Sequence, residues 1–145
     1  MLTIVAQVME ASTDKSDQKR VVEYGAHRAA EQFLAEANNG FSYQDDWWQV
    51  GFGSDGTVVG FVFPVIYPGC TQEGLEEASI YYIGVLPKYR GQNFGVDLLL
   101  KGTRVLQDVG VWRVFCDTAT QNIPMISTFK QAGYCQYGEP WQRPV

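Results

Sequence analysis

The stretch that decides the fold runs from Ile80 to Gly102 and reads IYYIGVLPKYRGQNFGVDLLLKG. Its first part, residues 80–86, is apolar and rich in β-branched and aromatic side chains, which is typical of a strand that stops at Pro87. A glycine-containing turn follows, and a helical pattern begins after it. A strand, a loop and a helix in this order gather free backbone N–H groups at a helix N-terminus, where the macrodipole places about half a positive charge. The stretch therefore predicts a seat for a diphosphate, to which the Arg90 side chain adds a permanent cation.

The helix after this loop is specified by its apolar face. Five residues recur at helical spacing and are expected to pack against a sheet: Val96, Leu99, Leu100, Thr103 and Leu106. Gly102 lies inside the helix, where glycine costs about 1 kcal/mol relative to alanine, so we expect another element to approach closely there. Gly110 is expected to end the helix.

Neither of the two common phosphate-loop motifs is present, because the chain has no G-x-x-x-x-G-K-[ST] and the loop is not G-x-G-x-x-G. The segment instead resembles the acyl-CoA signature of the GNAT acetyltransferases, V-x-P-x-x-R-G-x-G-x-G, through Val85, Pro87, Arg90, Gly91 and Gly95. Asn93 stands where the signature usually has its middle glycine. Asparagine is the non-glycine residue that best tolerates a left-handed backbone, so the turn is expected to be kept.

A second segment, Asn122 to Tyr134, strengthens this resemblance. It reads NIPMISTFKQAGY and is similar to the closing motif of the same family, N-x-x-x-I-x-x-Y-x-x-x-G-F. The motif usually has a tyrosine that protonates the departing CoA thiolate, and Phe129 occupies that position. The two segments have the order and separation that the family has, and together they span about half of the chain, Ile80 to Tyr134.

The pattern of elements predicts an α/β (α+β) fold. We expect a strand over residues 2–10, a helix capped by Ser16 or Asp17 that runs to about Ala37, a hairpin of residues 47–53 and 58–67, and a loop that begins at Pro68. Strands over residues 79–86 and 111–118 follow. This order suggests a mixed, mainly antiparallel twisted sheet with helices on both faces, which is also the architecture that the GNAT resemblance implies. Residues 136–145 can supply one strand at most, so a partner chain could complete the sheet edge in a homodimer.

Length and composition favour one globular domain over residues 1–145. The net charge of −5 and the lack of a basic stripe argue against nucleic acid or an anionic membrane as a partner. Three scattered cysteines and a start without a basic segment favour a reduced, cytoplasmic protein. The single histidine, His27, has no cluster of ligands around it, so no metal site is expected.

The resemblance implies acetyl-CoA as the co-substrate. It implies that Ile83 and Val85 pair with the pantetheine arm, that the Ile83 amide faces the thioester carbonyl, and that Asn122 and Phe129 lie beside the cofactor. The diphosphate would be held by the loop residues Arg90, Gly91, Gln92, Asn93, Phe94, Gly95 and Val96. Gly84, inside the strand, indicates either a bulge or a close approach of another element.

A general base is needed because an alkylamine is almost wholly protonated at neutral pH. Many relatives carry a glutamate at the position of Ser79, and others place an acid five residues before the closing motif, at Asp117. Asp117 is thus the preferred base, directly or through a water. The alternative is that it hydrogen-bonds a strand end or a helix N-terminus. Glu77, Tyr81 and Tyr82 are the other candidates.

An acceptor site is expected near Asp45, Trp47 and Trp48, where carboxylates and aromatic rings suit a cationic amine. The alternative is that these aromatics belong to the core. The chain is therefore interpreted as an N-acetyltransferase for the amine of a small molecule, with a protein amine as a close variant. A catalytically weak module that senses acyl-CoA, and a purely structural domain, are the competing interpretations.

Overall fold

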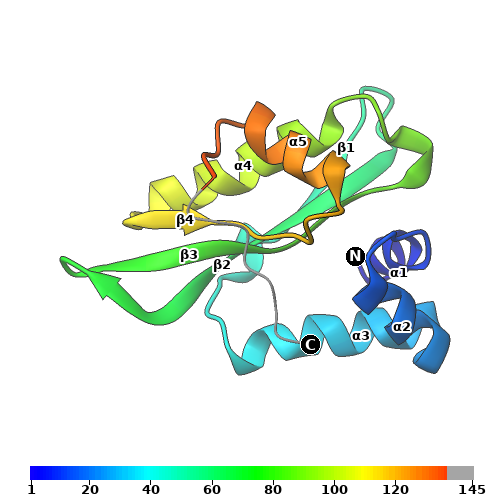
Figure 1. Ribbon diagram of the computed structural model, residues 1–145, viewed down its shortest axis with the longest axis horizontal. Helices are drawn as coiled ribbons and strands as arrows, with labels where there is room; N and C mark the ends of the chain where they lie inside the picture. The colour runs from blue at the N-terminus through cyan, green and yellow to red at the C-terminus, as the bar shows by residue number, and fades with distance from the viewer. Residues whose placement is uncertain (137–145) are drawn as a thin grey trace.

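A four-stranded sheet forms the centre of the computed structural model, which describes residues 1–136 (Figure 1). The strands are β1 (Gln49–Phe52), β2 (Val58–Gln72), β3 (Leu75–Val85) and β4 (Arg113–Phe115), and they lie side by side in this order. β1 and β3 are antiparallel to β2, whereas β4 is parallel to β3. The prediction of a mixed, mainly antiparallel sheet is confirmed.

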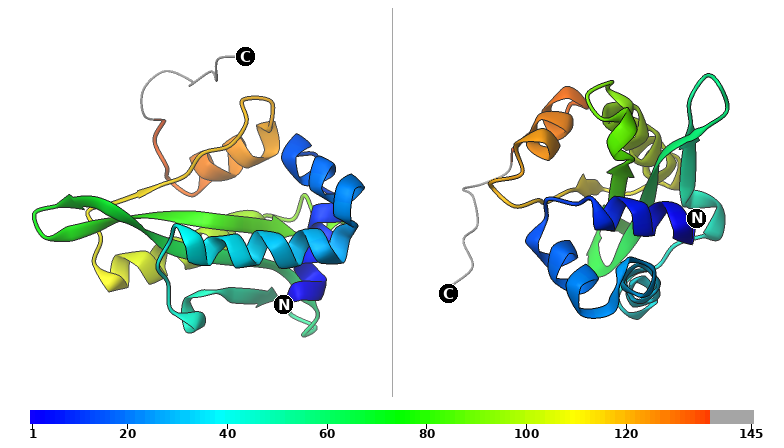
Figure 2. Two further views of the ribbon diagram at one scale, coloured as in Figure 1. Left: turned by 90° about the horizontal axis from the view of Figure 1, so that it is seen from below. Right: turned by 90° about the vertical axis from the view of Figure 1, so that its right-hand side faces the viewer.

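Helices cover both faces of this sheet (Figures 1 and 2). One face carries α1 (Leu2–Glu10), α2 (Lys15–Tyr24) and α3 (Ala26–Glu36), and the other carries α4 (Phe94–Val109) and α5 (Ile123–Gln131). Short 3-10 turns η1 (Ala37–Asn39), η2 (Asp45–Trp47) and η3 (Pro87–Tyr89) connect the elements. No helix within residues 1–136 is both long enough and apolar enough to cross a membrane.

The expected first strand is wrong, because residues 2–10 form the helix α1. Local β-branched residues favoured a strand, but the buried side chains follow helical spacing, with Ile4 above Val8 and Val5 above Met9. This face packs in one apolar cluster with Phe61 and Phe63 of β2. Tertiary packing against the sheet therefore overrides the local β preference.

The single helix expected from about residue 16 to 37 is broken in two at Gly25. Its φ of 81° is not helical, and it ends α2 and precedes α3. The N-cap of α2 is Asp14, whose carboxylate accepts hydrogen bonds from the amides of Ser16 and Asp17. Asp17 lies one turn further in and is buried.

β2 extends further than the strand predicted over residues 58–67. Pro68 and Gly69, expected to open a loop, lie inside β2, whose ladder with β3 is irregular after Tyr67 and resumes at Gln72, opposite Leu75. The chain reverses at Glu73 and Gly74, both with positive φ, which is the geometry of a tight hairpin turn. β1 begins only at Gln49, because Trp47 belongs to η2.

α4 packs on β2 and β3 through a face close to the predicted one. Leu99 and Leu106 are buried as expected, but Leu100 is 46% exposed and Leu98 is buried in its place. Gly102 allows the predicted close approach, since a Cβ there would lie 2.7 Å from Cγ2 of Val62. The helix ends at Gly110, as predicted.

Candidate functional site

The loop before α4 has the conformation that an anion seat requires. Gly91 has a φ of 79°, and Asn93 is left-handed with φ 66° and ψ 12°, as expected for the residue that replaces a glycine. Asn93 is the N-cap of α4, and its side chain makes no capping hydrogen bond. The helix α4 thus begins directly after this left-handed residue.

The backbone amides at this helix end are not used inside the described part of the protein. The first amide of the turn with an acceptor is that of Asp97, which donates to the carbonyl of Asn93 at 3.3 Å. Among residues 1–136, the amides from Gly91 to Val96 have no hydrogen-bond acceptor. Such a row of unsatisfied N–H groups, reinforced by the helix dipole, favours a bound anion.

The strand that leads into the loop has one edge without a partner. The Leu86 amide donates to the Val59 carbonyl at 2.8 Å, so Leu86 and Val59 form a hydrogen-bonded pair of the antiparallel ladder between β3 and β2. Pairs alternate along such a ladder, so the backbone groups of Ile83 and Val85 point away from β2. On that side β4 pairs with β3 only over residues 77–79. Beyond this point, no described strand pairs with β3, and its edge from Ile83 to Val85 is open.

Cys116 lies where β3 and β4 separate. Its thiol hydrogen-bonds with the Ile80 backbone and with the Tyr134 hydroxyl, and burial raises the pKa of the thiol to about 11. The thiol is therefore protonated at neutral pH and is a poor nucleophile. The hydrogen bond between the Cys116 thiol and the Ile80 backbone takes the place of the next backbone pair between β3 and β4.

Arg90 connects the loop to two other elements. Its Nε donates to the Val85 carbonyl at 3.2 Å, and its Nη1 donates to the Ala11 carbonyl, at the end of α1, at 3.4 Å. The Val85 carbonyl points to the open edge, so Arg90 occupies the end of that edge. The side chain is exposed, and a guanidinium has further N–H donors that remain for an anion.

Gly84 is explained by close packing, and the bulge lies elsewhere. A Cβ at Gly84 would lie 2.5 Å from Cγ1 of Val8 and 2.9 Å from Cζ of Phe61, so glycine lets α1 approach the sheet. The ladder of β2 and β3 skips Tyr81, which places the Tyr81 and Tyr82 rings on the same face. Both rings contact Phe33 of α3, with centroids 4.8 and 4.9 Å away.

The closing motif forms α5. Asn122 caps this helix, since its Oδ1 accepts from the Met125 amide at 3.3 Å while its Nδ2 donates to Thr118 Oγ1 at 3.2 Å. The Phe129 ring lies 6.0 Å from the Tyr134 ring. The Tyr134 hydroxyl is hydrogen-bonded to Thr103 of α4, which holds α5 beside α4.

The candidate bases differ in their surroundings. Asp117 is exposed on the segment between β4 and α5. Glu77 is buried and forms an ion pair with Arg113 at 2.6 Å, a structural role. Burial raises the pKa of Tyr81 to about 12, and its hydroxyl donates to the Phe33 carbonyl at 2.6 Å. Burial also raises the pKa of Tyr82 well above its ordinary value, so both phenols stay protonated at neutral pH.

The aromatic set predicted for the acceptor is not brought together. Trp48 is stacked between Tyr43 and Phe63, with centroids 4.1 and 4.4 Å away, and packs in the cluster under α1 and α3. Trp47 packs in a different cluster, with Leu106 of α4. Asp45 is exposed in η2. Both tryptophans thus have core contacts, and their role in acceptor binding stays a prediction.

Sequence reasoning treated Asp17 only as a possible helix cap and missed its surroundings. The Tyr82 hydroxyl donates to Oδ2 of Asp17 at 2.7 Å, and the Asp17 residue is only 7% exposed. Burial raises the pKa of this carboxyl above its ordinary value. Because Asp17 stands in a polar stretch, nothing in its local sequence indicates that it faces the sheet.

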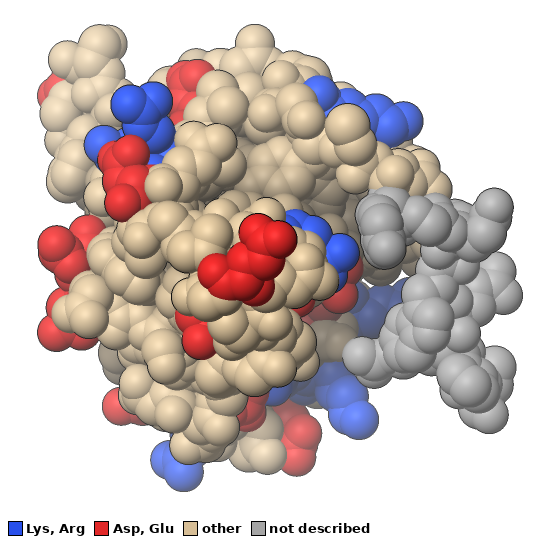
Figure 3. All heavy atoms as spheres, turned by 90° about the vertical axis from the view of Figure 1, so that its left-hand side faces the viewer, with Lys and Arg blue, Asp and Glu red and all other residues tan. Residues whose placement is uncertain are grey.

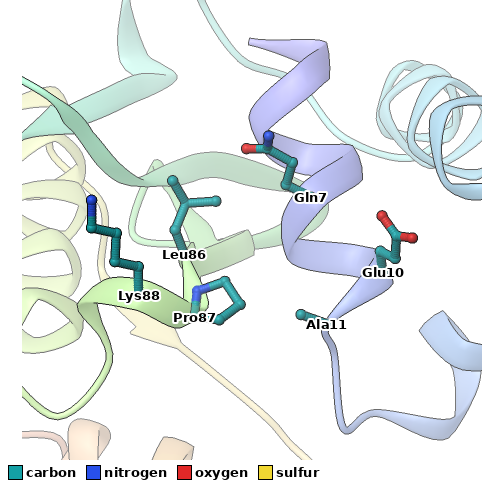
Figure 4. Close-up of a pocket in the computed structure, with 6 residues that line it drawn as sticks. All are labelled: Gln7, Glu10, Ala11, Leu86, Pro87 and Lys88. Atoms are coloured by element: carbon teal, nitrogen blue, oxygen red, sulfur yellow. The ribbon is translucent and has the colours of Figure 1, made fainter.

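A pocket of about 410 Å³ lies beside the loop, between the end of α1 and the end of β3 (Figure 4). Gln7 and Ala11 face Leu86 and Pro87 across it. None of its lining residues belongs to the stretch from Ile80 to Val85, so we do not assign the reaction centre to it.

Comparison with known proteins identifies the class. The model of the acetyltransferase (GNAT) family matches residues 10–134, and the chain belongs to this family. Mycothiol acetyltransferase of Pseudarthrobacter chlorophenolicus is 29% identical over 119 residues, which cover 77% of this chain and 36% of that protein. The mycothiol acetyltransferase of Cellulomonas flavigena is 30% identical over 96 residues, covering 59% and 28%. The chain spans about a third of the length of these curated relatives.

Solved structures share the fold. An acetyltransferase from Trypanosoma brucei is 16% identical with a TM-score of 0.61, over 100% of this chain and 95% of that chain. The structure of AAC(6')-Iy with a bisubstrate analog, CoA-S-monomethyl-acetylneamine, is 20% identical with a TM-score of 0.56, over 84% of this chain and 80% of that chain. At these identities the likeness shows the fold alone.

Proposed function

We propose that this protein is an N-acetyltransferase that transfers an acetyl group from acetyl-CoA to an amine of a small molecule. The observation that carries the proposal is the row of amides from Gly91 to Val96, which have no acceptor within residues 1–136 and lie at the N-terminus of α4. Membership of the acetyltransferase (GNAT) family supports it.

The residues present fit an acyl-CoA. The amides of the loop and the remaining donors of Arg90 would hold the diphosphate. The open edge of β3 offers the Ile83 and Val85 amides and the Ile83 carbonyl to a pantetheine arm, while the Val85 carbonyl is already taken by Arg90. Asn122 and Phe129, on α5, would flank the arm from the other side.

Acetyl-CoA supplies an acetyl group that is already activated as a thioester, so positioning is expected to dominate the rate. The Ile83 amide would donate to the carbonyl oxygen of that group as negative charge develops there. A preorganised donor of this kind lowers a barrier by roughly 3 kcal/mol. Asp117 and Tyr82 are the residues proposed to handle the proton of the amine.

The acceptor is proposed to be a small-molecule amine for two reasons. The curated relatives that the chain matches are mycothiol acetyltransferases, and one structural neighbour contains an acetylneamine analog. The net charge of −5 also favours a cationic acceptor. On the face shown in Figure 3, acidic and basic side chains alternate without a continuous basic area that would suit a polyanion.

A second candidate function is a module that binds acyl-CoA without efficient turnover. Ser79 and Phe129 stand where the family usually has a glutamate and a tyrosine, and neither can exchange a proton at neutral pH. The pKa of the leaving thiol is about 8.5, so the CoA thiolate can depart without a dedicated acid to protonate it.

Calorimetric titration with CoA, followed by assay of free thiol from acetyl-CoA, tests both functions. The amines offered are spermidine, an aminoglycoside and an amino acid. Binding together with amine-dependent thiol release is the expected result, whereas binding without release identifies the sensor. Failure to bind millimolar CoA would contradict both. Arg90→Ala should weaken CoA binding by about tenfold, because it removes a charge-assisted contact.

A further inference from the structure

Asp17 is a buried acid that the chemistry above leaves unused. It lies in the first turn of α2 and is 7% exposed. The helix does not need the Asp17 side chain as a cap, because the Asp14 carboxylate already accepts from the amides of Ser16 and Asp17. A carboxylate away from water costs free energy even when hydrogen-bonded, so an acid at a place where the helix does not require one points to a function.

Its partner from the sheet is Tyr82. The phenolic proton of Tyr82 is donated to Oδ2 of Asp17, which leaves the lone pairs of the phenol oxygen as an acceptor. Tyr82 directly precedes Ile83, whose amide lies on the open edge of β3. The edge runs between α2 on one side of the sheet and α5 on the other (Figure 2). The Tyr82 hydroxyl and its Asp17 partner therefore lie on the α2 side of the residue whose amide faces this edge.

The charged groups around Tyr82 and Asp17 leave this pair in a negative electrostatic environment. Asp14 repels and Arg20 attracts the Asp17 carboxylate, and Ser12 hydrogen-bonds to it. The Arg20 charge is largely compensated, since its guanidinium is bound to Glu36 through contacts of 2.8 and 3.0 Å. From the loop, the Arg90 cation also acts on Tyr82. A small cation would find net attraction here.

We propose that Tyr82, with Asp17 behind it, forms the amine end of the acceptor site and carries the amine proton away. The proposal rests on the proposed function and names its substrate class, a primary alkylamine that enters as the ammonium. Tyr82 touches the amine, and Asp17 acts through Tyr82 as the positioning residue that receives the proton.

The proton balance is simple. One ammonium proton passes to the Tyr82 oxygen while the phenolic proton passes to Oδ2 of Asp17, so Tyr82 ends neutral and Asp17 ends protonated. The nitrogen lone pair then forms the C–N bond as the C–S bond breaks and its electron pair leaves with sulfur. The thiolate takes the second nitrogen proton, and Asp17 returns its proton to water.

Asp17→Asn separates this role from a merely structural one. Asparagine keeps an oxygen that can accept from Tyr82 but cannot take a proton, and it relieves the burial of a charge. The raised pKa of Asp17 means that its ionisation costs stability above that pKa, a cost that disappears as the pH falls below the ordinary value. The variant should thus have an equal or higher Tm at pH 7, and the difference should shrink toward pH 4.

Spermidine is the probe, and Glu23→Gln, an exposed acid on the same helix, is the matched control. With CoA binding intact, Asp17→Asn should lower kcat for spermidine about a hundredfold at pH 7. This deficit should shrink by about tenfold per pH unit up to pH 9, because the amine then loses its proton to water. Tyr82→Phe should raise the KM for spermidine and lower kcat, whereas Glu23→Gln should match the wild type.

Three results would overturn the inference while leaving the proposed function intact. The wild type could bind CoA yet neither bind nor acetylate spermidine. The Asp17→Asn variant could keep wild-type kcat, or lose it by the same factor at every pH. Finally, a pH-dependent deficit that appears in Asp117→Asn but not in Asp17→Asn would assign the proton to Asp117.

Discussion

Replacing Gly95 with aspartate is expected to weaken CoA binding by roughly a hundredfold while the fold keeps its stability. Gly95 lies in the first turn of α4, between two amides without an internal acceptor, and a Cβ there would meet only ordinary contacts at 3.7–3.8 Å with Thr128 and Val85. A carboxylate in the first turn satisfies the helix dipole, worth about 0.3–1 kcal/mol of stability. The same charge repels a diphosphate by about 2–3 kcal/mol at close range.

Gly95→Asn is the matched control, because it has the size of aspartate without the charge. Isothermal titration with CoA and thermal unfolding should be measured for both variants. The aspartate variant should unfold no earlier than the asparagine variant and bind CoA far more weakly. If the two variants bind CoA equally, no anion sits at this end of α4 and the acetyltransferase proposal fails.

Gly60→Ala is expected to cause the largest loss of stability, about 3 kcal/mol, or roughly 10 °C in Tm. A Cβ at Gly60 of β2 would collide with the backbone carbonyl oxygen of Gly84 in β3 and lie 2.8 Å from Cδ1 of Leu98. The leucine can move, but the carbonyl cannot move without shifting β3. Since Gly60 is the ladder partner of Val85, the shift would also disturb the open edge.

The control for this change is Gly40→Ala. No atom lies within 4 Å of a Cβ at Gly40, and its φ of −143° suits any residue. This substitution should leave the free energy of unfolding within about 1 kcal/mol of the wild type, with a slight gain from the stiffer unfolded chain. A Gly60→Ala protein as stable as Gly40→Ala would show that β2 and β3 can separate more easily than their packing indicates.

The parts that sequence predicted well are those that local chemistry determines. The turn at Gly91 and Asn93, the close approach at Gly102 and the helix end at Gly110 each follow from the backbone preference of one or two residues. The first motif lies on the loop before α4, and the second forms α5. The mixed sheet followed from the order of elements.

The errors arose where packing outweighs local preference. The β-branched start of the chain forms α1 because the apolar stripe of a helix covers Phe61 and Phe63. A related feature that the sequence did not indicate is that Trp47 and Trp48, adjacent in the chain, pack in different apolar clusters.

The sequence by itself determined the segment in which we propose an anion seat. Each requirement of that seat, a strand end, a left-handed turn and a helix start, is satisfied within a short run of residues. Only the tertiary structure decided which groups surround the open edge. Asp17 and Tyr82 are 65 positions apart and meet because α2, which packs against α1 and α3, brings the Asp17 carboxylate to the Tyr82 hydroxyl of β3. Burial raises the pKa of both side chains, and burial is a property that no residue has until the chain has folded around it.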